Sequence, residues 1–157
     1  KHKPIVCAAV IKAIREADCI ILSMGSLFTS ILPNLICKDV IKEIDKSKAK
    51  IVYVCNIMTQ PGETDNFKVS NHVSLLNKYL GKRKIDVVIA NNGQIDKNVI
   101  EKYASLEQKD QVELDKEELK KMKVKVIKDD LISIENEQIR HDTLKLAFYI
   151  YATLIKN

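Results

Sequence analysis

The sharpest chemical signal in this 157-residue sequence is a glycine-serine turn that follows a short apolar run. Gly25 and Ser26 come after Cys-Ile-Ile-Leu at 19–22, and Thr29 adds a further hydroxyl three residues later. Glycine lets a backbone approach a ligand closely, and the N–H groups at a helix start favour phosphate. The alternative for the same residues is a turn with serine and threonine caps. Because polar loops elsewhere in the sequence accompany this one, we favour a phosphate-bearing ligand.

Those other polar loops each follow an apolar run that reads as a buried strand. The expected strands are 18–24, 50–56, 85–90 and 123–127. In an open parallel sheet, ligands bind in the crevice beyond the carboxyl ends of the strands. The candidate ligand-binding residues in these loops are therefore Gly25, Ser26, Thr29, Asn56, Thr59, Gln60, Glu63, Asn91 and Asn92.

The loop after the second expected strand also contains carboxylates. Pro61 and Gly62 are the pair favoured at the centre of a type II turn, and Glu63 and Asp65 follow. Mg²⁺ usually takes one or two carboxylates and keeps several waters, so these two side chains could hold Mg²⁺ beside a diphosphate. They could equally cap local amides. We therefore assign no metal-binding residues, and Mg²⁺ remains a possible cofactor.

Two further candidates come from the second half of the sequence. Arg140 precedes the final helix, and a guanidinium there would make a bidentate anion site. Tyr103 could stack on a planar base, or it could face the core from its helix. His141, next to Arg140, has no identifiable nucleophile partner. His72, at a helix start after the loop over 59–65, fits a capping or packing role better than catalysis. No catalytic residue is therefore assigned.

Helices are expected between and around these strands. Apolar spacing and caps predict them over 4–17, 33–47, 71–80, 96–105 and 142–155, with Asp115 as part of a capping box that opens a brief charged helix. Repeated β-α units of this length call for one α/β domain, 1–157, with a parallel sheet covered by helices on both faces.

Composition excludes several classes of protein. With 46% hydrophobic residues the chain can bury a core, and no apolar run is long enough to span a membrane. The net charge of +5 is small and the basic residues are not interleaved with aromatics, so nucleic acid is not expected as a partner. The four cysteines lack metal spacing and read as small buried side chains in a reducing cytoplasm.

Taken together, these motifs resemble one family. The string CNIMTQPGET at 55–64, the segments Asn71-His72-Val73 and Asn91-Asn92, and Arg140-His141-Asp142 follow in the order seen in the gluconeogenesis factor family of the YvcK type. That family belongs to the superfamily of 2-phospho-L-lactate transferase, the CofD-like proteins. The resemblance covers nearly the whole chain.

The resemblance implies a Rossmann-like fold and a cytoplasmic protein that binds UDP-sugars and is linked to cell shape and carbon metabolism. It implies that Tyr103 and Arg140 contact the nucleotide sugar. Two departures stand out. Ser23-Met24 replace the family's usual Gly-Pro, and this chain lacks the family's glycine-rich loop, so it resembles the C-terminal portion of a longer chain.

Three functions remain open from the sequence. The first is a regulatory protein that binds UDP-sugars without catalysis. The second is a Mg²⁺-dependent, 2-phospho-L-lactate transferase-like enzyme that uses a nucleoside-diphosphate donor. The third is a structural remnant whose partner half supplies the site. Whether any catalysis remains is undecided, and a homo-oligomer stays open as well.

Overall fold

A four-stranded parallel sheet forms the centre of the computed structural model, which describes residues 5–135 and 138–155. The strands lie in the order β1-β2-β3-β4, and every neighbouring pair is parallel. Their bounds are β1 Cys19–Leu22, β2 Lys50–Val54, β3 Val87–Asn91 and β4 Lys125–Asp129. The four strands predicted from apolar runs are confirmed. The first two are shorter than predicted, whereas β3 and β4 begin two residues later and end one and two residues later than predicted.

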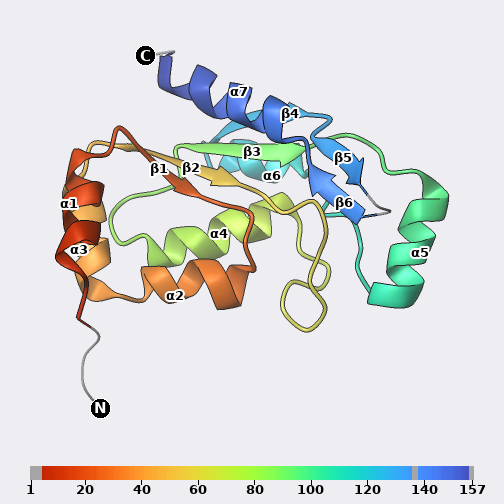
Figure 1. The fold of residues 1–157 in the computed structure, drawn as a ribbon, viewed down its shortest axis with the longest axis horizontal. Coiled ribbons are helices and arrows are strands. Elements are labelled where there is room, and N and C mark those ends of the chain that lie inside the picture. Colours follow the sequence, from red (N-terminus) through yellow and green to blue (C-terminus); the bar gives the residue numbers. More distant parts are fainter. Residues whose placement is uncertain (1–4, 136–137, 156–157) are drawn as a thin grey trace.

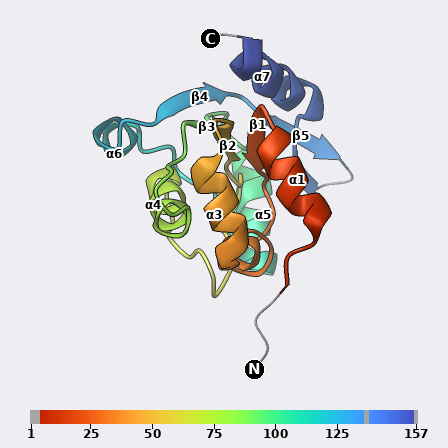
Figure 2. The ribbon, with the colours of Figure 1, turned by 90° about the vertical axis from the view of Figure 1, so that its left-hand side faces the viewer.

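Helices cover both faces of this sheet, as the alternating pattern predicted. Helices α1 to α4 lie against one face and α7 lies across the other (Figures 1 and 2). A small antiparallel hairpin stands beside the carboxyl end of the sheet. The bounds are α1 Ala8–Glu16, a π-helical segment η1 Leu27–Ile31 that continues into α2 Leu32–Leu35, α3 Lys38–Lys46, α4 Val69–Tyr79, α5 Lys97–Glu107, α6 Lys116–Lys121, β5 Ile132–Glu135, β6 Gln138–His141 and α7 Thr143–Ile155.

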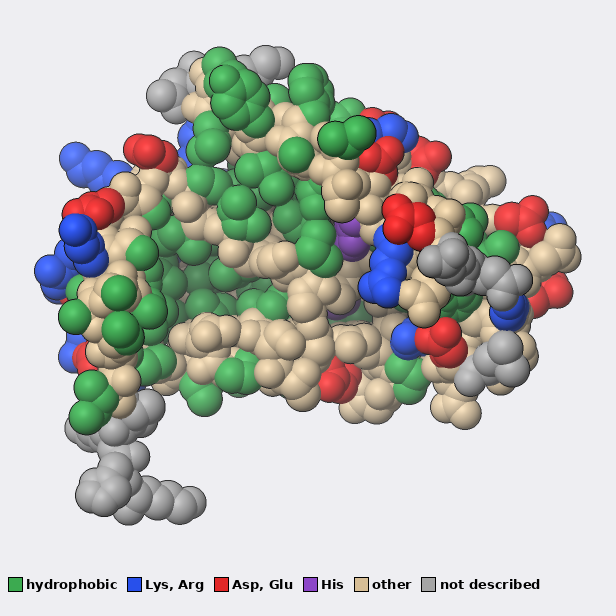
Figure 3. Space-filling view, viewed as in Figure 1, with side chains coloured by type: hydrophobic (Ala, Val, Ile, Leu, Met, Phe, Trp, Pro, Cys, Tyr) green, Lys and Arg blue, Asp and Glu red, His purple; other side chains and the backbone are tan. Residues whose placement is uncertain are grey.

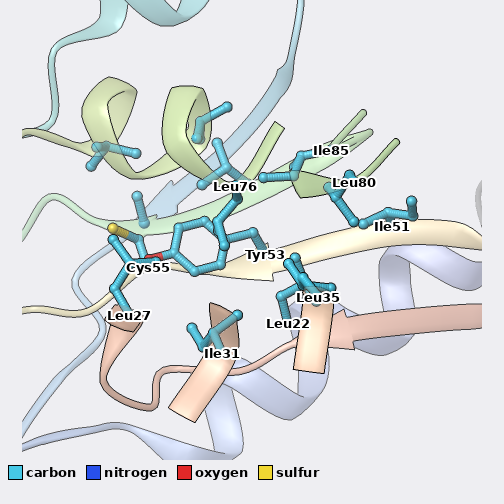
Figure 4. Close-up of a cluster of buried hydrophobic side chains, with 14 of the residues drawn as sticks. Leu22, Leu27, Ile31, Leu35, Ile51, Tyr53, Cys55, Leu76, Leu80 and Ile85 are labelled. Carbon is cyan, nitrogen blue, oxygen red and sulfur yellow. The ribbon is translucent and has the colours of Figure 1, made fainter. Parts of the chain in front are cut away.

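The two faces of β2 supply two separate hydrophobic clusters, because successive side chains of a strand point to opposite sides. Ile51 and Tyr53 point into the larger cluster with Leu76 of α4 (Figure 4). Val52 and Val54 point to the other face, where Leu146 of α7 packs. These four side chains of β2 are essentially inaccessible to solvent. The sheet is thus held from both sides, and its carboxyl edge is fixed in space.

Several predicted boundaries were wrong. The single helix expected over 33–47 is broken, because Cys37 is extended with φ −76° and ψ 107°. Ile36, which a continuous helix would place on the apolar face, is 64% exposed. Apolar spacing alone fits one long helix as well as two short ones. In the folded chain the segment forms two helices, α2 and α3. At the N-terminus the helix begins at Ala8, and Pro4 lies outside the described residues.

The capping box predicted at Asp115 was also wrong. Asp115 precedes α6, but its side chain makes no capping bond to that helix. Its carboxylate instead accepts hydrogen bonds from the N–H and the hydroxyl of Ser70, in the first turn of α4. The hairpin of β5 and β6 was not predicted at all. Over the described part of the chain, helices are too short or too polar to cross a bilayer.

Two glycines with left-handed backbone allow a direct test of how tightly α4 is joined to α3. Gly81 has φ +66°, and a Cβ there would lie 2.7 Å from Ile41 Cγ2 and 2.8 Å from Asp45 Oδ1. Gly62 has φ +75° with nothing within 4 Å. We expect Gly62→Ala to lower the free energy of unfolding by about 1 kcal/mol through backbone strain alone.

Gly81→Ala should cost more, about 2–3 kcal/mol, because it adds a steric clash to the same strain. Urea unfolding of both variants measures this difference. Equal losses in the two variants would contradict the close contact between the turn after α4 and helix α3.

Candidate functional site

A polar cleft of about 680 Å³ lies at the carboxyl end of the sheet. Its walls come from the loops after β1 and β2, the end of α5, and the hairpin of β5 and β6. On the face shown in Figure 3, histidine is visible in a recess below α7 and beside the hairpin. The lining residues are Met24, Ser26, Asn56, Ile57, Met58, Thr59, Gln60, Tyr103, Glu107, Lys109, Glu135, Gln138, Ile139, Arg140, His141 and Thr143.

Asn56 ties the first wall of the cleft to the second. It follows the end of β2, and its amide donates to the carbonyl oxygens of Met24 at 3.0 Å and Gly25 at 3.3 Å. The Tyr53 hydroxyl donates a hydrogen bond to Asn56 Oδ1 at 3.5 Å. A backbone carbonyl left unpaired at the end of a strand would cost free energy, so one amide here satisfies two such groups. The position of the Gly25-Ser26 turn therefore depends on Asn56.

Ser26 connects the same turn to the loop after β2. Its hydroxyl accepts bonds from the Thr29 N–H at 3.2 Å and the Thr29 hydroxyl at 2.6 Å, and it donates to Glu63 Oε2 at 2.6 Å. Ser26 is thus the cap of the segment that begins at Leu27, as the alternative interpretation of the sequence held. Ser26 caps this segment and also lines the cleft, so the capping role does not exclude a role in ligand binding.

The loop over 59–65 is held by its own side chains. The Thr64 hydroxyl accepts from the Gln60 N–H at 2.8 Å, and the Glu63 N–H donates to the Gln60 carbonyl at 3.1 Å across a turn in which Gly62 has positive φ. The Asp65 carboxylate accepts from the Gly62 N–H at 2.8 Å. Glu63 and Asp65 therefore bond to different partners. Within the described residues, no three His, Cys, Asp or Glu side chains gather in a metal-binding arrangement.

Two asparagines at the end of β3 join the loops that follow β3 and β4. Asn91 is buried, and its Oδ1 accepts from the N–H groups of Gly93 at 3.1 Å and Leu131 at 2.9 Å. The Asn92 N–H donates to the Asp129 carbonyl at 3.0 Å. These bonds fasten the end of β3 to the end of β4. The structure does not bring Asn91 and Asn92 to the cleft lining.

Of the eleven candidate residues, the structure brings six to the cleft and leaves five outside its lining. Those that line it are Ser26, Asn56, Thr59, Gln60, Tyr103 and Arg140, and those that do not are Gly25, Thr29, Glu63, Asn91 and Asn92. Gly25, Thr29 and Glu63 nevertheless bond directly to lining residues.

Tyr103 and Arg140 both line the wall that α5 and the hairpin form. Tyr103 is 8% exposed, and its hydroxyl accepts from the Ile139 N–H at 2.8 Å, which anchors β6 on α5. Arg140 lies on β6 and donates to the neutral amide of Gln138. The second lining cation, Lys109, instead pairs with Glu107 at 2.5 Å. In the described part of the chain, Arg140 forms no ion pair.

His141 is a cleft residue that sequence reasoning did not select. Its Nε2 lies 3.1 Å from the Cys55 carbonyl oxygen, and burial lowers the pKa of the imidazole more than this bond raises it. The signal that would have found it is strand alternation next to Arg140. That signal was hidden because the hairpin itself was not predicted.

His72, in contrast, belongs to the core. It is 1% exposed, its Nδ1 lies 2.9 Å from the Tyr53 hydroxyl, and the Phe67 ring packs edge-on against it. Burial lowers the pKa of His72 to about 4, so the ring is neutral near pH 7. The packing role expected from the sequence is confirmed.

Comparison with known proteins adds a family to this geometry. The family model described as 2-phospho-L-lactate transferase CofD matches residues 1–132. The gluconeogenesis factor of Bacillus subtilis strain 168 is 46% identical over 137 residues, which cover 87% of this chain and 43% of that protein. The gluconeogenesis factor of Listeria innocua is 39% identical over 144 residues, covering 92% and 44%.

The fold has a solved counterpart. A crystal structure of a UPF0052 family member from Bacillus halodurans superposes with a TM-score of 0.87 at 35% identity, covering 92% of this chain and 46% of that one. The chain and the Bacillus halodurans protein therefore share the α/β fold with a parallel sheet. In all three comparisons the chain spans less than half the length of the relative.

The bonds around Ser26 predict a measurable loss on substitution. We expect Ser26→Ala to lower the free energy of unfolding by about 1–2 kcal/mol, because it removes a helix cap and the partner of Glu63. Ser105→Ala, at an exposed serine on α5, is the matched control and should change stability by less than about 0.5 kcal/mol. Urea unfolding of both variants decides whether Ser26 holds the turn.

Proposed function

This chain belongs to the CofD family, and we propose that it binds a UDP-sugar such as UDP-N-acetylglucosamine in the cleft at the carboxyl end of its sheet. The proposed role is regulatory, of the gluconeogenesis factor type linked to cell shape and carbon metabolism, and cytoplasmic. Four cysteines without a disulfide suit a reducing compartment. The relatives named gluconeogenesis factor support the type of protein.

The observation that carries this proposal is the guanidinium of Arg140, which lines the cleft and forms no ion pair with any described residue. Arg140 donates to a neutral partner, and guanidinium groups bind phosphate oxygens in a bidentate manner. The cleft volume of about 680 Å³ lies inside the range of about 300–1,000 Å³ that is common for small-molecule sites. Polar groups of Asn56, Thr59 and Gln60 can fix the orientation of such a ligand.

A second candidate function is a Mg²⁺-dependent transferase that moves a phospholactyl group from a nucleoside-diphosphate donor. The description of the matching family model favours it. So does the carboxylate of Glu63, which bonds to Ser26 in the cleft wall. Phosphoryl chemistry depends on positioning and charge, so it does not require a protein nucleophile. Turnover of a phospholactate donor with Mg²⁺, in place of simple UDP-sugar binding, would establish this function.

Calorimetric titration with UDP-N-acetylglucosamine and GDP, each with and without Mg²⁺, tests the leading proposal. We expect the UDP-sugar to bind and Arg140→Ala to weaken binding by about 10- to 100-fold, because a charge-assisted hydrogen bond contributes about 1.5–3 kcal/mol. Lys12→Ala removes one positive charge from the exposed surface of α1 and should leave affinity unchanged. Unchanged affinity in Arg140→Ala would contradict the proposal.

We also propose that residues 1–157 form one α/β domain that packs against a further polypeptide segment, and that this segment covers β1 and α7. The relatives are more than twice as long as the part that matches this chain. In the described residues, β1 has a neighbour on one side only and carries no charged side chain. The other edge strand, β4, carries Lys125 and Lys128, which discourage pairing.

The exposed face of α7 continues this apolar surface. Its uncovered side chains recur at helical spacing, and Figure 3 shows hydrophobic side chains gathered from α7 down to α1. Contiguous apolar surface of this kind marks an interaction site. The exposed residues are Leu144, Phe148, Tyr151 and Ile155 on α7 and Ile21 on β1.

Mixing this chain with the unmatched region of the Bacillus subtilis relative tests the proposed contact. We expect a one-to-one complex by light scattering, and we expect Ile21→Lys to abolish it by placing a charge on the β1 edge. Ile36→Lys, at an exposed isoleucine between α2 and α3, should leave the complex intact. Self-association of this chain alone would show instead that a second copy covers the surface.

A further inference from the structure

We infer that His141 accepts a hydrogen bond from a hydroxyl group of the bound ligand and so fixes which end of a nucleotide sugar lies beside it. This inference rests on the proposed UDP-sugar binding and adds a residue and an orientation to it.

Strand alternation separates His141 from its neighbour Arg140. On β6, Gln138 and Arg140 are exposed, whereas Ile139 and His141 point to the opposite, half-buried side. The His141 ring thereby reaches the end of β2, where its Nε2 lies 3.1 Å from the Cys55 carbonyl oxygen. Both His141 and Arg140 line the cleft. The strand thus presents two different chemical groups to one ligand.

The bond to Cys55 decides which ring nitrogen carries the proton. A carbonyl oxygen only accepts, so Nε2 of His141 must donate, and in the neutral ring Nδ1 then keeps its lone pair. The structure gives this Nδ1 no hydrogen-bond partner among the described residues. Among the described residues, the buried side-chain nitrogen or oxygen atom that lacks a hydrogen-bond partner is Nε2 of His72. Nδ1 of His141 also lacks a partner but does not belong to this class, so it is not fully buried. Nδ1 of His141 is therefore an accessible acceptor.

An acceptor can bind a hydroxyl or an N–H group, but it repels the oxygens of a phosphate. A diphosphate would therefore lie toward Arg140, and a hydroxyl of the hexose or the ribose would lie at His141. The other charged groups near the ring are mixed in sign, so they do not favour an anion at this position. They are Glu135 and Arg140 on the hairpin, Glu107 and Lys109 at the end of α5, and Asp142 next in the chain.

This arrangement makes ligand affinity depend on pH. Burial holds the pKa of His141 below its ordinary value of 6.5, so the ring is neutral at pH 7.5 and gains a proton as the pH falls through the lowered pKa. Protonation replaces the lone pair by a second donor, so the hydroxyl loses its partner. Ligand affinity should therefore decrease as the pH falls. UDP-N-acetylglucosamine is the suitable probe because its diphosphate lacks the terminal phosphate that ionises with a pKa of about 6.

Calorimetric titration of the full chain with UDP-N-acetylglucosamine between pH 5 and 8 tests the inference. We expect affinity to fall about fivefold toward the acid end, the loss of one hydrogen bond. His141→Gln keeps an amide donor for the Cys55 carbonyl but does not titrate, so it should fold normally and bind with no such pH dependence. Lys12→Ala, on the exposed surface of α1, is the control and should keep the pH dependence of the original chain.

A second probe, the methyl ester of UDP, separates the two sources of the hydroxyl. A pH dependence that persists with it assigns the hydroxyl to the ribose, and one that disappears assigns it to the hexose. Affinity that rises at low pH, or binding that is independent of pH in the original chain, would overturn the inference while leaving UDP-sugar binding intact. No binding at any pH would overturn the proposed function and this inference with it.

Discussion

Parallel pairing of β1 to β4 is the constraint on which the rest of this structure depends. It brings the carboxyl ends of all four strands to one edge, where the backbone leaves carbonyl and N–H groups without strand partners. Asparagine amides satisfy these groups. Asn56 bonds to carbonyls of the loop after β1, and Asn91 bonds to N–H groups of the loops after β3 and β4. The need to pair these backbone groups therefore joins the loops to one another and also places Asn56 in the cleft lining.

The two asparagines differ in what remains available for a ligand. Asn91 uses its amide on both sides and lies outside the cleft lining, so its contribution is to hold β3 and β4 together. Asn56 lines the cleft while it also holds the Gly25-Ser26 turn. Side chains that look alike in the sequence thus separate into a structural group and a group that faces the cleft.

The hairpin of β5 and β6 gives the cleft its chemical asymmetry. The Tyr103 hydroxyl holds β6 in place, and the strand then directs Arg140 outward and His141 inward. One side of the cleft consequently carries the Arg140 cation, which pairs with no carboxylate among the described residues, and the other carries a neutral ring bonded to the Cys55 carbonyl. The cleft thus combines a guanidinium with several neutral polar groups.

The sequence by itself determined the fold class, because the alternation of short aliphatic runs with amphipathic segments has one economical arrangement, a parallel sheet between helices. It also determined that polar loops such as Asn56 to Gln60 gather at one edge, since that follows from parallel strands alone. It did not reveal the break at Cys37, because apolar spacing fits one helix or two equally well.

Only the tertiary structure decided where the hairpin lies, because its four-residue strands carry no distinctive pattern and are stabilised by Tyr103, which is distant in sequence. For the same reason only the tertiary structure distinguished His141 from His72. One ring bonds to a carbonyl at the cleft and the other is sealed in the core, and burial of this kind is set by residues that the local sequence does not contain.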